Sequence, residues 1–198
     1  VELPDAPDYP GGDERALWHI DRGIETFKRH FGYKPSGCWP SEGAVSDAAV
    51  ALFEQEGFRW VASGQQVLHN SLSAAGADMS APASWIHTPY RLASGRIHGF
   101  FRDDGLSDLI GFEYSGMSGQ AAADDFMERL GRANDRLETL GGNGPKVVTI
   151  IVDGENAWEH YTNDGKDFLN ALYASLSASD LVRTVTPSEL LSQFGDQV

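Results

Sequence analysis

The sequence predicts an α/β protein in which helices cover a parallel sheet. Stretches with apolar residues at helical spacing alternate with short apolar stretches along most of the 198 residues. The short stretches are apolar throughout, as in parallel strands that are covered on both faces. A chain of this length forms one domain or at most two. We expect an irregular entry segment over 1–13, which is rich in Pro, Gly and Asp, and one folded region over 14–198.

Apolar residues that recur every three or four positions predict the helices. The second helix has a clear start, because Ser46 can cap its free amides, and Gly57 ends it. Ser118 can cap the longest helix in the same way. The predicted helices span 14–31, 46–57, 119–140, 168–176 and 187–194.

Apolar and β-branched stretches bounded by turn residues predict the strands. We expect 84–92 and 96–103 to form a hairpin around Gly95, and 147–152 to be a strand buried on both faces. Residues 69–84 predict a surface loop or a ragged helix, and 106–115 a loop or a short helix. The predicted strands span 58–63, 84–92, 96–103, 147–152 and 182–186.

The composition argues against several classes of function. A net charge of −14 repels nucleic acid and anionic membranes, so we expect neither as a partner. No stretch approaches the roughly 18 apolar residues of a membrane span. The single cysteine, Cys38, rules out an intrachain disulfide, and none of the six histidines forms an HxH or HxxxH pair, so we expect no metal and no cofactor. The lone cysteine and the lack of a signal peptide lead us to expect a cytoplasmic location.

Two acidic segments follow predicted strands. WPSE ends at Glu42, and DGENAWE begins at Asp153. Ligands of parallel α/β folds sit at the carboxyl ends of the strands, and two carboxylates there can break a glycosidic bond, one by attack and one by protonation. Trp39 and Trp158 would suit the apolar face of a sugar. From the residues alone, a helix cap or a solvated loop explains such acids equally well.

Four stretches together resemble glycoside hydrolase family 57. They are WPSEGAVS with FRWVAS, FRDDGLSDLIGFEYS, IIVDGENAWEHY and GKDFLNALY, in this order, and the resemblance runs from about Glu14 to Leu191. That family contains α-amylases, amylopullulanases, 4-α-glucanotransferases and branching enzymes on an irregular seven-stranded (β/α) barrel. The resemblance therefore implies a retaining glycosidase or transglycosidase that acts on α-glucans or malto-oligosaccharides with α-1,4 or α-1,6 linkages.

The resemblance also implies roles for individual residues. Glu42 matches the family's nucleophile and Asp153 its general acid/base, and a retaining mechanism places two such carboxyls about 5–5.5 Å apart. No metal or cofactor is implied. The residues expected to line the sugar subsites are Trp39, Glu155, Trp158, Arg102 and Asp108.

The chain departs from the family pattern in three places. The family's N-terminal His-Gln-Pro motif and its second motif have no counterpart, the loop 63–66 lacks acids, and Asp104 stands where relatives tend to have His. We therefore expect only the second part of a (β/α)7-type barrel, whose exposed strand edges would favour self-association. Two alternatives stay open: a non-catalytic carbohydrate-binding or regulatory remnant of the fold, and a metal-dependent polysaccharide deacetylase, against which the lack of paired histidines argues.

Overall fold

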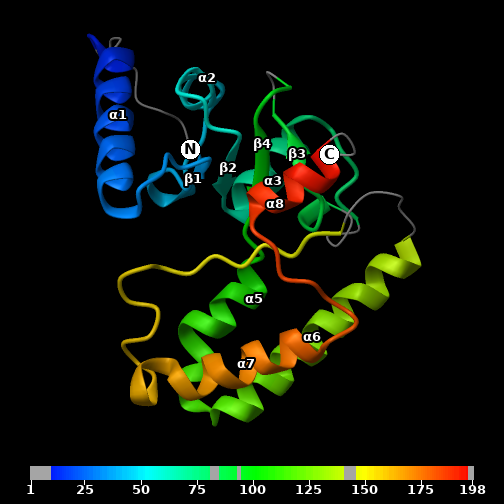
Figure 1. Ribbon diagram of the computed structural model, residues 1–198. Helices are drawn as coiled ribbons and strands as arrows, with labels where there is room; N and C mark the ends of the chain where they lie inside the picture. The colour runs from blue at the N-terminus through cyan, green and yellow to red at the C-terminus, as the bar shows by residue number, and fades with distance from the viewer. Residues whose placement is uncertain (1–9, 81–84, 93–94, 141–145, 196–198) are drawn as a thin grey trace.

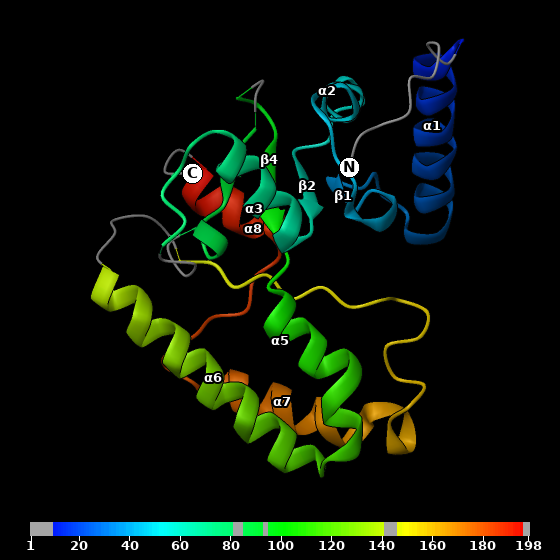
Figure 2. The same cartoon turned by 180° about the vertical axis from the view of Figure 1, so that it is seen from behind.

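A computed structural model describes residues 10–80, 85–92, 95–140 and 146–195. A small sheet with α2, α3 and α8 forms one part of the molecule, and α5, α6 and α7 form the other (Figures 1 and 2). The helices are α1 (Gly12–Phe31), α2 (Asp47–Gln55), α3 (Gln65–Ala74), α5 (Asp104–Asp108), α6 (Gly119–Leu140), α7 (Lys166–Ala178) and α8 (Pro187–Phe194). The short helical turns are η1 (Ser41–Gly43), η2 (Leu109–Glu113), η3 (Tyr114–Gly116) and η4 (Thr162–Gly165).

The sheet confirms the predicted α/β class. Its strands are β1 (Gly37–Cys38), β2 (Trp60–Ser63), β3 (Tyr90–Arg91) and β4 (His98–Phe101), in the spatial order β1-β2-β4-β3. Strands β1, β2 and β4 run parallel to one another. Val61 of β2 lies opposite Cys38 of β1 on one side and opposite Gly99 of β4 on the other. The edge strand β3 is antiparallel to β4. Because β1, β2 and β4 run the same way, the loops that follow them meet at one end of the sheet.

Local sequence signals account for the helix boundaries. The Ser46 hydroxyl accepts the amide of Ala49 at 3.2 Å and starts α2 as predicted. Thr186 and Glu189 form a capping box that starts α8. Gly32 ends α1 in the left-handed conformation that glycine adopts readily.

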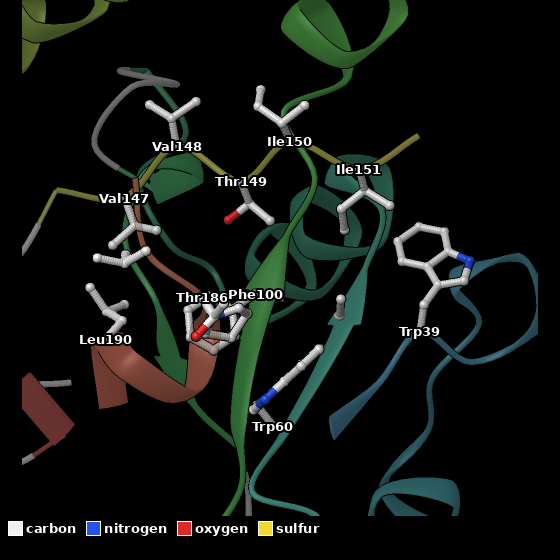
Figure 3. A pocket seen from close by; sticks show the side chains of 13 residues that line it. Trp39, Trp60, Phe100, Val147, Val148, Thr149, Ile150, Ile151, Thr186 and Leu190 are labelled. Carbon is white, nitrogen blue, oxygen red and sulfur yellow. The ribbon is translucent and has the colours of Figure 1, made fainter. Parts of the chain in front are cut away.

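The predicted strand at 147–152 is not a regular strand. Thr149 makes a single parallel bridge with Arg102, and the six residues are only half-buried. Side chains alternate along this extended segment: Val147 and Ile151 point toward the sheet, while Ile150 points toward the helical part (Figure 3). A ladder needs consecutive paired residues, and in the described residues this segment forms only the one pair.

Two further strand predictions need correction. Residues 182–186 form no strand with any described part of the chain, and Val185 packs against the sheet cluster. Within 84–92, Trp85 is helical, and only Tyr90 and Arg91 form a strand. Residues 69–84 are predicted to form a loop or a ragged helix, and their first part, 69–74, belongs to α3, which begins earlier, at Gln65. Residues 81–84 lie outside the described residues.

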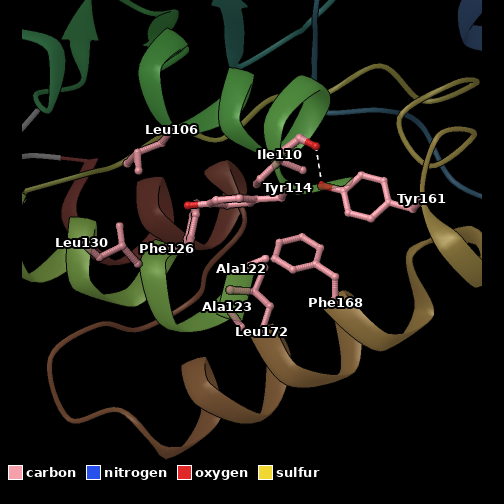
Figure 4. Close-up of a cluster of buried hydrophobic side chains, with 10 residues drawn as sticks. All are labelled: Leu106, Ile110, Tyr114, Ala122, Ala123, Phe126, Leu130, Tyr161, Phe168 and Leu172. Atoms are coloured by element: carbon pink, nitrogen blue, oxygen red, sulfur yellow. Dashed lines mark hydrogen bonds between the residues drawn. The ribbon is translucent and has the colours of Figure 1, made fainter. Parts of the chain in front are cut away.

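The largest apolar cluster lies in the helical part and joins α5, α6 and α7 with the turn before η4 (Figure 4). Tyr114 and Phe168 are its most buried large side chains, at 1% and 2% exposure. The Tyr161 hydroxyl donates to the carbonyl of Ile110 at 2.5 Å and ties the segment after Asp153 to η2. The cluster therefore supports one side of the 147–152 segment, and the sheet supports the other.

Candidate active site

Glu42 lies in a turn with an unusual backbone. Its φ of 54° is in the left-handed region, which costs a residue with a side chain about 1–2 kcal/mol. Trp39 covers the following glycine, Gly43, so closely that a Cβ added there would lie 2.8 Å from the indole. The turn thus presents Glu42 on the surface, where the Glu42 side chain is exposed and makes no hydrogen bond or ion pair in the described residues.

Ser63 attaches this turn to the end of β2. Its hydroxyl donates to the carbonyl of Gly43 at 2.5 Å, and the residue is 1% exposed. Two residues later, the side-chain oxygen of Gln65 accepts the amide of Asp104 at 3.2 Å. The loops after β1, β2 and β4 are therefore linked in series at the carboxyl end of the sheet.

Arg102 directly follows β4 and makes hydrogen bonds in three directions. Its NH1 group donates to Asp104 at 2.8 Å, its NH2 group to Asp108 at 2.6 Å, and its Nε to the carbonyl of Ile151 at 2.9 Å. Burial would lower the pKa of Arg102, but its hydrogen bonds to Asp108 and Asp104 outweigh that effect and raise it. Arg102 is thus a fixed cation, and its side chain is 18% exposed.

Asp103, the residue after Arg102, forms a largely buried pair with His87. The Nε2 atom of His87 lies 2.9 Å from one carboxylate oxygen of Asp103, and the other oxygen accepts the amide of Leu106. Burial raises the pKa of Asp103, but the hydrogen bonds from His87 and Leu106 outweigh it, and the pKa lies below the ordinary value. Asp103 therefore remains ionised in the folded protein near neutral pH.

The segment that leads to Asp153 is attached to this same cluster. The amide of Val147 donates to the carbonyl of His87 and the amide of Asp103 to the carbonyl of Thr149, each at 2.9 Å. The amide of Ile151 donates to the Ser107 hydroxyl at 3.2 Å. Asp153 follows two residues later with an exposed side chain that makes no hydrogen bond or ion pair in the described residues.

A cavity of about 300 Å³ lies between this segment, the sheet and α8. Trp39 and Ile151 both line it and stand next to each other at one end (Figure 3). Glu42 follows Trp39 by three positions, and Asp153 follows Ile151 by two. The cavity is therefore lined by a residue three positions before Glu42 and by one two positions before Asp153, while neither acid is among its lining residues.

The two remaining predicted sugar-contact residues lie beyond Asp153. Glu155 is exposed and makes no hydrogen bond or ion pair in the described residues. The Trp158 ring packs on Gly165, where an added Cβ would lie 2.9 Å away, and its centroid is 5.5 Å from that of Tyr161. Trp158 is thus partly built into the helical cluster, and part of its ring stays accessible.

The structure brings some predicted site residues together and reveals others. Arg102 and Asp108 contact each other directly, and Trp39 lies on the cavity that the Asp153 segment also lines. Sequence reasoning did not single out the residues that join these loops, although most of them lie inside the quoted stretches FRWVAS and FRDDGLSD. The residues that join the loops are Ser63, Gln65, His87, Asp103 and Ser107.

No group of three or more His, Cys, Asp or Glu side chains in the described ranges could hold a metal ion. Among the helices of those ranges, none is long and apolar enough to cross a membrane.

Comparisons with known proteins give the chain its family. No curated protein matches it. Among solved structures, it is similar to an α-amylase from Thermotoga maritima, with a TM-score of 0.75 and 14% identity, over 92% of this chain and 45% of that one. It is also similar to a 4-α-glucanotransferase from Thermococcus litoralis, with a TM-score of 0.60 and 21% identity, over 92% of this chain and 26% of that one. The chain therefore spans less than half the length of either protein. The family description "Glycosyl hydrolase family 57" matches residues 3–198, and the chain belongs to that family.

Proposed function

We propose that this chain carries the two catalytic carboxyls of a retaining glycosidase or transglycosidase that acts on α-glucans. Glu42 is the nucleophile and Asp153 the general acid/base. The observation that carries the proposal is the shared cavity, since Trp39 and Ile151 line it together and lead to the two acids. Membership of the family and the named activities of the two similar enzymes support the substrate class.

The chemistry proceeds in two displacements. The Glu42 carboxylate attacks the anomeric carbon while Asp153 donates its proton to the leaving glycosidic oxygen, which gives a glycosyl ester on Glu42. Asp153 then takes a proton from water or from a sugar hydroxyl, whose oxygen attacks the anomeric carbon and releases Glu42. Water as acceptor gives hydrolysis, and a second glucan chain gives transfer.

The surrounding side chains suit a sugar with an apolar face and several hydroxyls. Trp39 is 41% exposed and offers an indole face beside Glu42. Glu155 and the half-exposed Asp108 offer carboxylate oxygens to hydroxyl groups. Trp158 contributes the part of its ring that the helical cluster leaves uncovered.

We propose further that the chain forms one part of a (β/α)7-type barrel and works in the cytoplasm. The amide of Val147 bonds to His87, and the backbone groups of Thr149 and Ile151 bond to Arg102, Asp103 and Ser107. Those of the intervening Val148 and Ile150 have no hydrogen bond in the described residues. Such an edge accepts a further strand. Self-association through this edge would appear as a concentration-dependent mass in analytical ultracentrifugation.

The test of the proposed function is incubation of the chain with malto-oligosaccharides, with and without a chelator. We expect cleavage or transfer that ignores the chelator, with the α-anomer as the first product seen by NMR. Glu42→Gln and Asp153→Asn should each lower the rate at least about 100-fold, while Glu25→Gln and Asp180→Asn on the surface should not. Binding without turnover would replace the proposal by the carbohydrate-binding alternative, and a chelator-sensitive deacetylation by the deacetylase alternative.

A further inference from the structure

Arg102 connects the end of β4 to the segment that carries Asp153. We propose that Arg102 is a positioning residue, which holds Asp153 in place through the carbonyl of Ile151 and does not bind the sugar itself. The inference rests on the proposed role of Asp153 as general acid/base. It replaces the role of sugar contact that the sequence suggested for Arg102.

Ile151 is the last residue before Asp153 that makes a hydrogen bond in the described residues, and Val152 after it packs against the helical cluster. The Ile151 carbonyl accepts Nε of Arg102 at 2.9 Å, and its amide donates to the hydroxyl of Ser107 at 3.2 Å. From Val152 to Glu155, no residue makes a hydrogen bond in the described part of the chain. The placement of the Asp153 carboxyl therefore depends on how firmly Ile151 is held by hydrogen bonds and Val152 by packing.

The two carboxylates around Arg102 fix the orientation of its guanidinium plane. Asp104 and Asp108, at the two ends of α5, hold NH1 and NH2 at 2.8 Å and 2.6 Å. With both terminal nitrogens held, the Nε–H bond is aimed at Ile151. A lysine has its three donors on one nitrogen and cannot span these three acceptors, so the geometry is specific to arginine.

The same contacts make Arg102 a poor sugar ligand. Each of its three nitrogens already donates to an acceptor, and the side chain is only 18% exposed. Three of the five N–H groups are used in this way, and the small exposed fraction leaves little of the guanidinium accessible to a sugar hydroxyl. Asp108, whose side chain is 52% exposed and which uses one oxygen for Arg102, is better placed to meet a hydroxyl.

A positioning role and a binding role differ in their dependence on the leaving group. Cleavage of a malto-oligosaccharide needs a proton from Asp153, because a sugar alkoxide leaves poorly. An aryl α-maltoside with an acidic phenol needs little protonation in the same step. The ratio of kcat/KM on these two substrates therefore reports how well Asp153 is placed, since kcat/KM reports the step that forms the glycosyl-enzyme.

The experiment compares Arg102→Lys and Arg102→Met in the full 198-residue chain with Asp153→Asn as benchmark. Arg132→Met, which removes a surface arginine of α6 paired with Glu128, is the matched control. We expect both Arg102 variants to lose about 10- to 100-fold in kcat/KM on malto-oligosaccharide, as removal of part of a general acid's effect should. The aryl substrate should lose less than about 3-fold. Asp153→Asn should show the same bias, and Arg132→Met no change.

Several results would overturn the inference. An equal rise of KM on both substrates with kcat unchanged would make Arg102 a sugar contact. Equal losses on both substrates together with a lower Tm would make it merely structural. Hydrogen exchange gives a readout that needs no activity: Arg102→Met should speed exchange of the Ile151 amide at least 10-fold over its rate in Arg132→Met, with α7 unaffected. Unchanged exchange there would sink the positioning role, whereas an inactive wild-type chain with changed exchange would sink only the proposed function.

Discussion

Gly43→Ala tests whether the Glu42 turn is built as described. Gly43 has a φ of 66°, so alanine there takes a left-handed backbone conformation at a cost of roughly 1–2 kcal/mol. The new Cβ would also meet the Trp39 indole at 2.8 Å and the amide nitrogen of Gly64 at 3.2 Å. Overpacking of this kind adds about 1–3 kcal/mol, which brings the expected loss to roughly 2–5 kcal/mol in free energy of unfolding.

Gly32→Ala is the matched control. Gly32 has a φ of 80° at the end of α1, and a Cβ there would have no atom within 4 Å. Gly32→Ala should lower the free energy of unfolding only by the cost of the left-handed backbone, about 1–2 kcal/mol. The difference between the two variants isolates the crowding at Gly43.

Urea unfolding followed by circular dichroism measures both losses. Acrylamide quenching, compared with a Trp39→Phe variant, reports the indole, which we expect to swing further into solvent in Gly43→Ala because its 41% exposure leaves it free to move outward. Equal losses of stability in the two glycine variants, with no change in quenching of Trp39, would refute the described packing of the turn.

Three further predictions concern buried polar groups. Because the pKa of Asp103 lies below its ordinary value of 3.8, its pair with His87 stabilises the fold fully above that pH, and the stability lost in Asp103→Asn should shrink as pH falls from 5 to 2 in thermal unfolding. Burial raises the pKa of the Cys38 thiol to about 11, so alkylation by iodoacetamide at pH 8 should be roughly 100-fold slower in the native chain than in urea. Tyr161→Phe leaves the carbonyl of Ile110 without its donor and should cost about 1–3 kcal/mol in urea unfolding.

Each of these has an outcome that contradicts it. A stability gap between wild type and Asp103→Asn that stays constant from pH 7 to 2 would mean that the pair with His87 does not form. Equal alkylation of native and unfolded Cys38 would show an exposed thiol. Tyr173→Phe, at a site 60% exposed, should be near neutral, and an equal loss in both tyrosine variants would argue against the Tyr161 hydrogen bond.

The helices follow from the sequence because their hydrogen bonds close within a few residues. The cap at Ser46, the end of α1 at Phe31 and the start of α8 at Pro187 lie where the residues predict them. The strands were predicted less accurately than the helices, because a strand exists only when a partner strand lies beside it. The same apolar content that predicts a strand at 147–152 is compatible with an extended segment between two clusters.

The candidate site divides in a similar way. The stretches around Glu42 and Asp153 carry enough pattern to indicate the family, and the match over 3–198 confirms it. The roles of the two acids stay predictions, and so do those of the sugar-contact residues. No pattern along the chain indicates that Ser63 holds the turn of Glu42 or that Arg102 contacts Ile151, since those partners are 20 and 49 positions apart.

The sequence by itself determined the α/β class, the positions of most helices and the family, because each rests on residues close together in the chain or on the order of short motifs. Only the tertiary structure decided the left-handed turn at Glu42, the two-sided packing of the segment before Asp153 and the hydrogen bonds of Arg102. The physical reason is that these features depend on contacts between distant segments. Such contacts form where the sheet brings the carboxyl ends of its strands together.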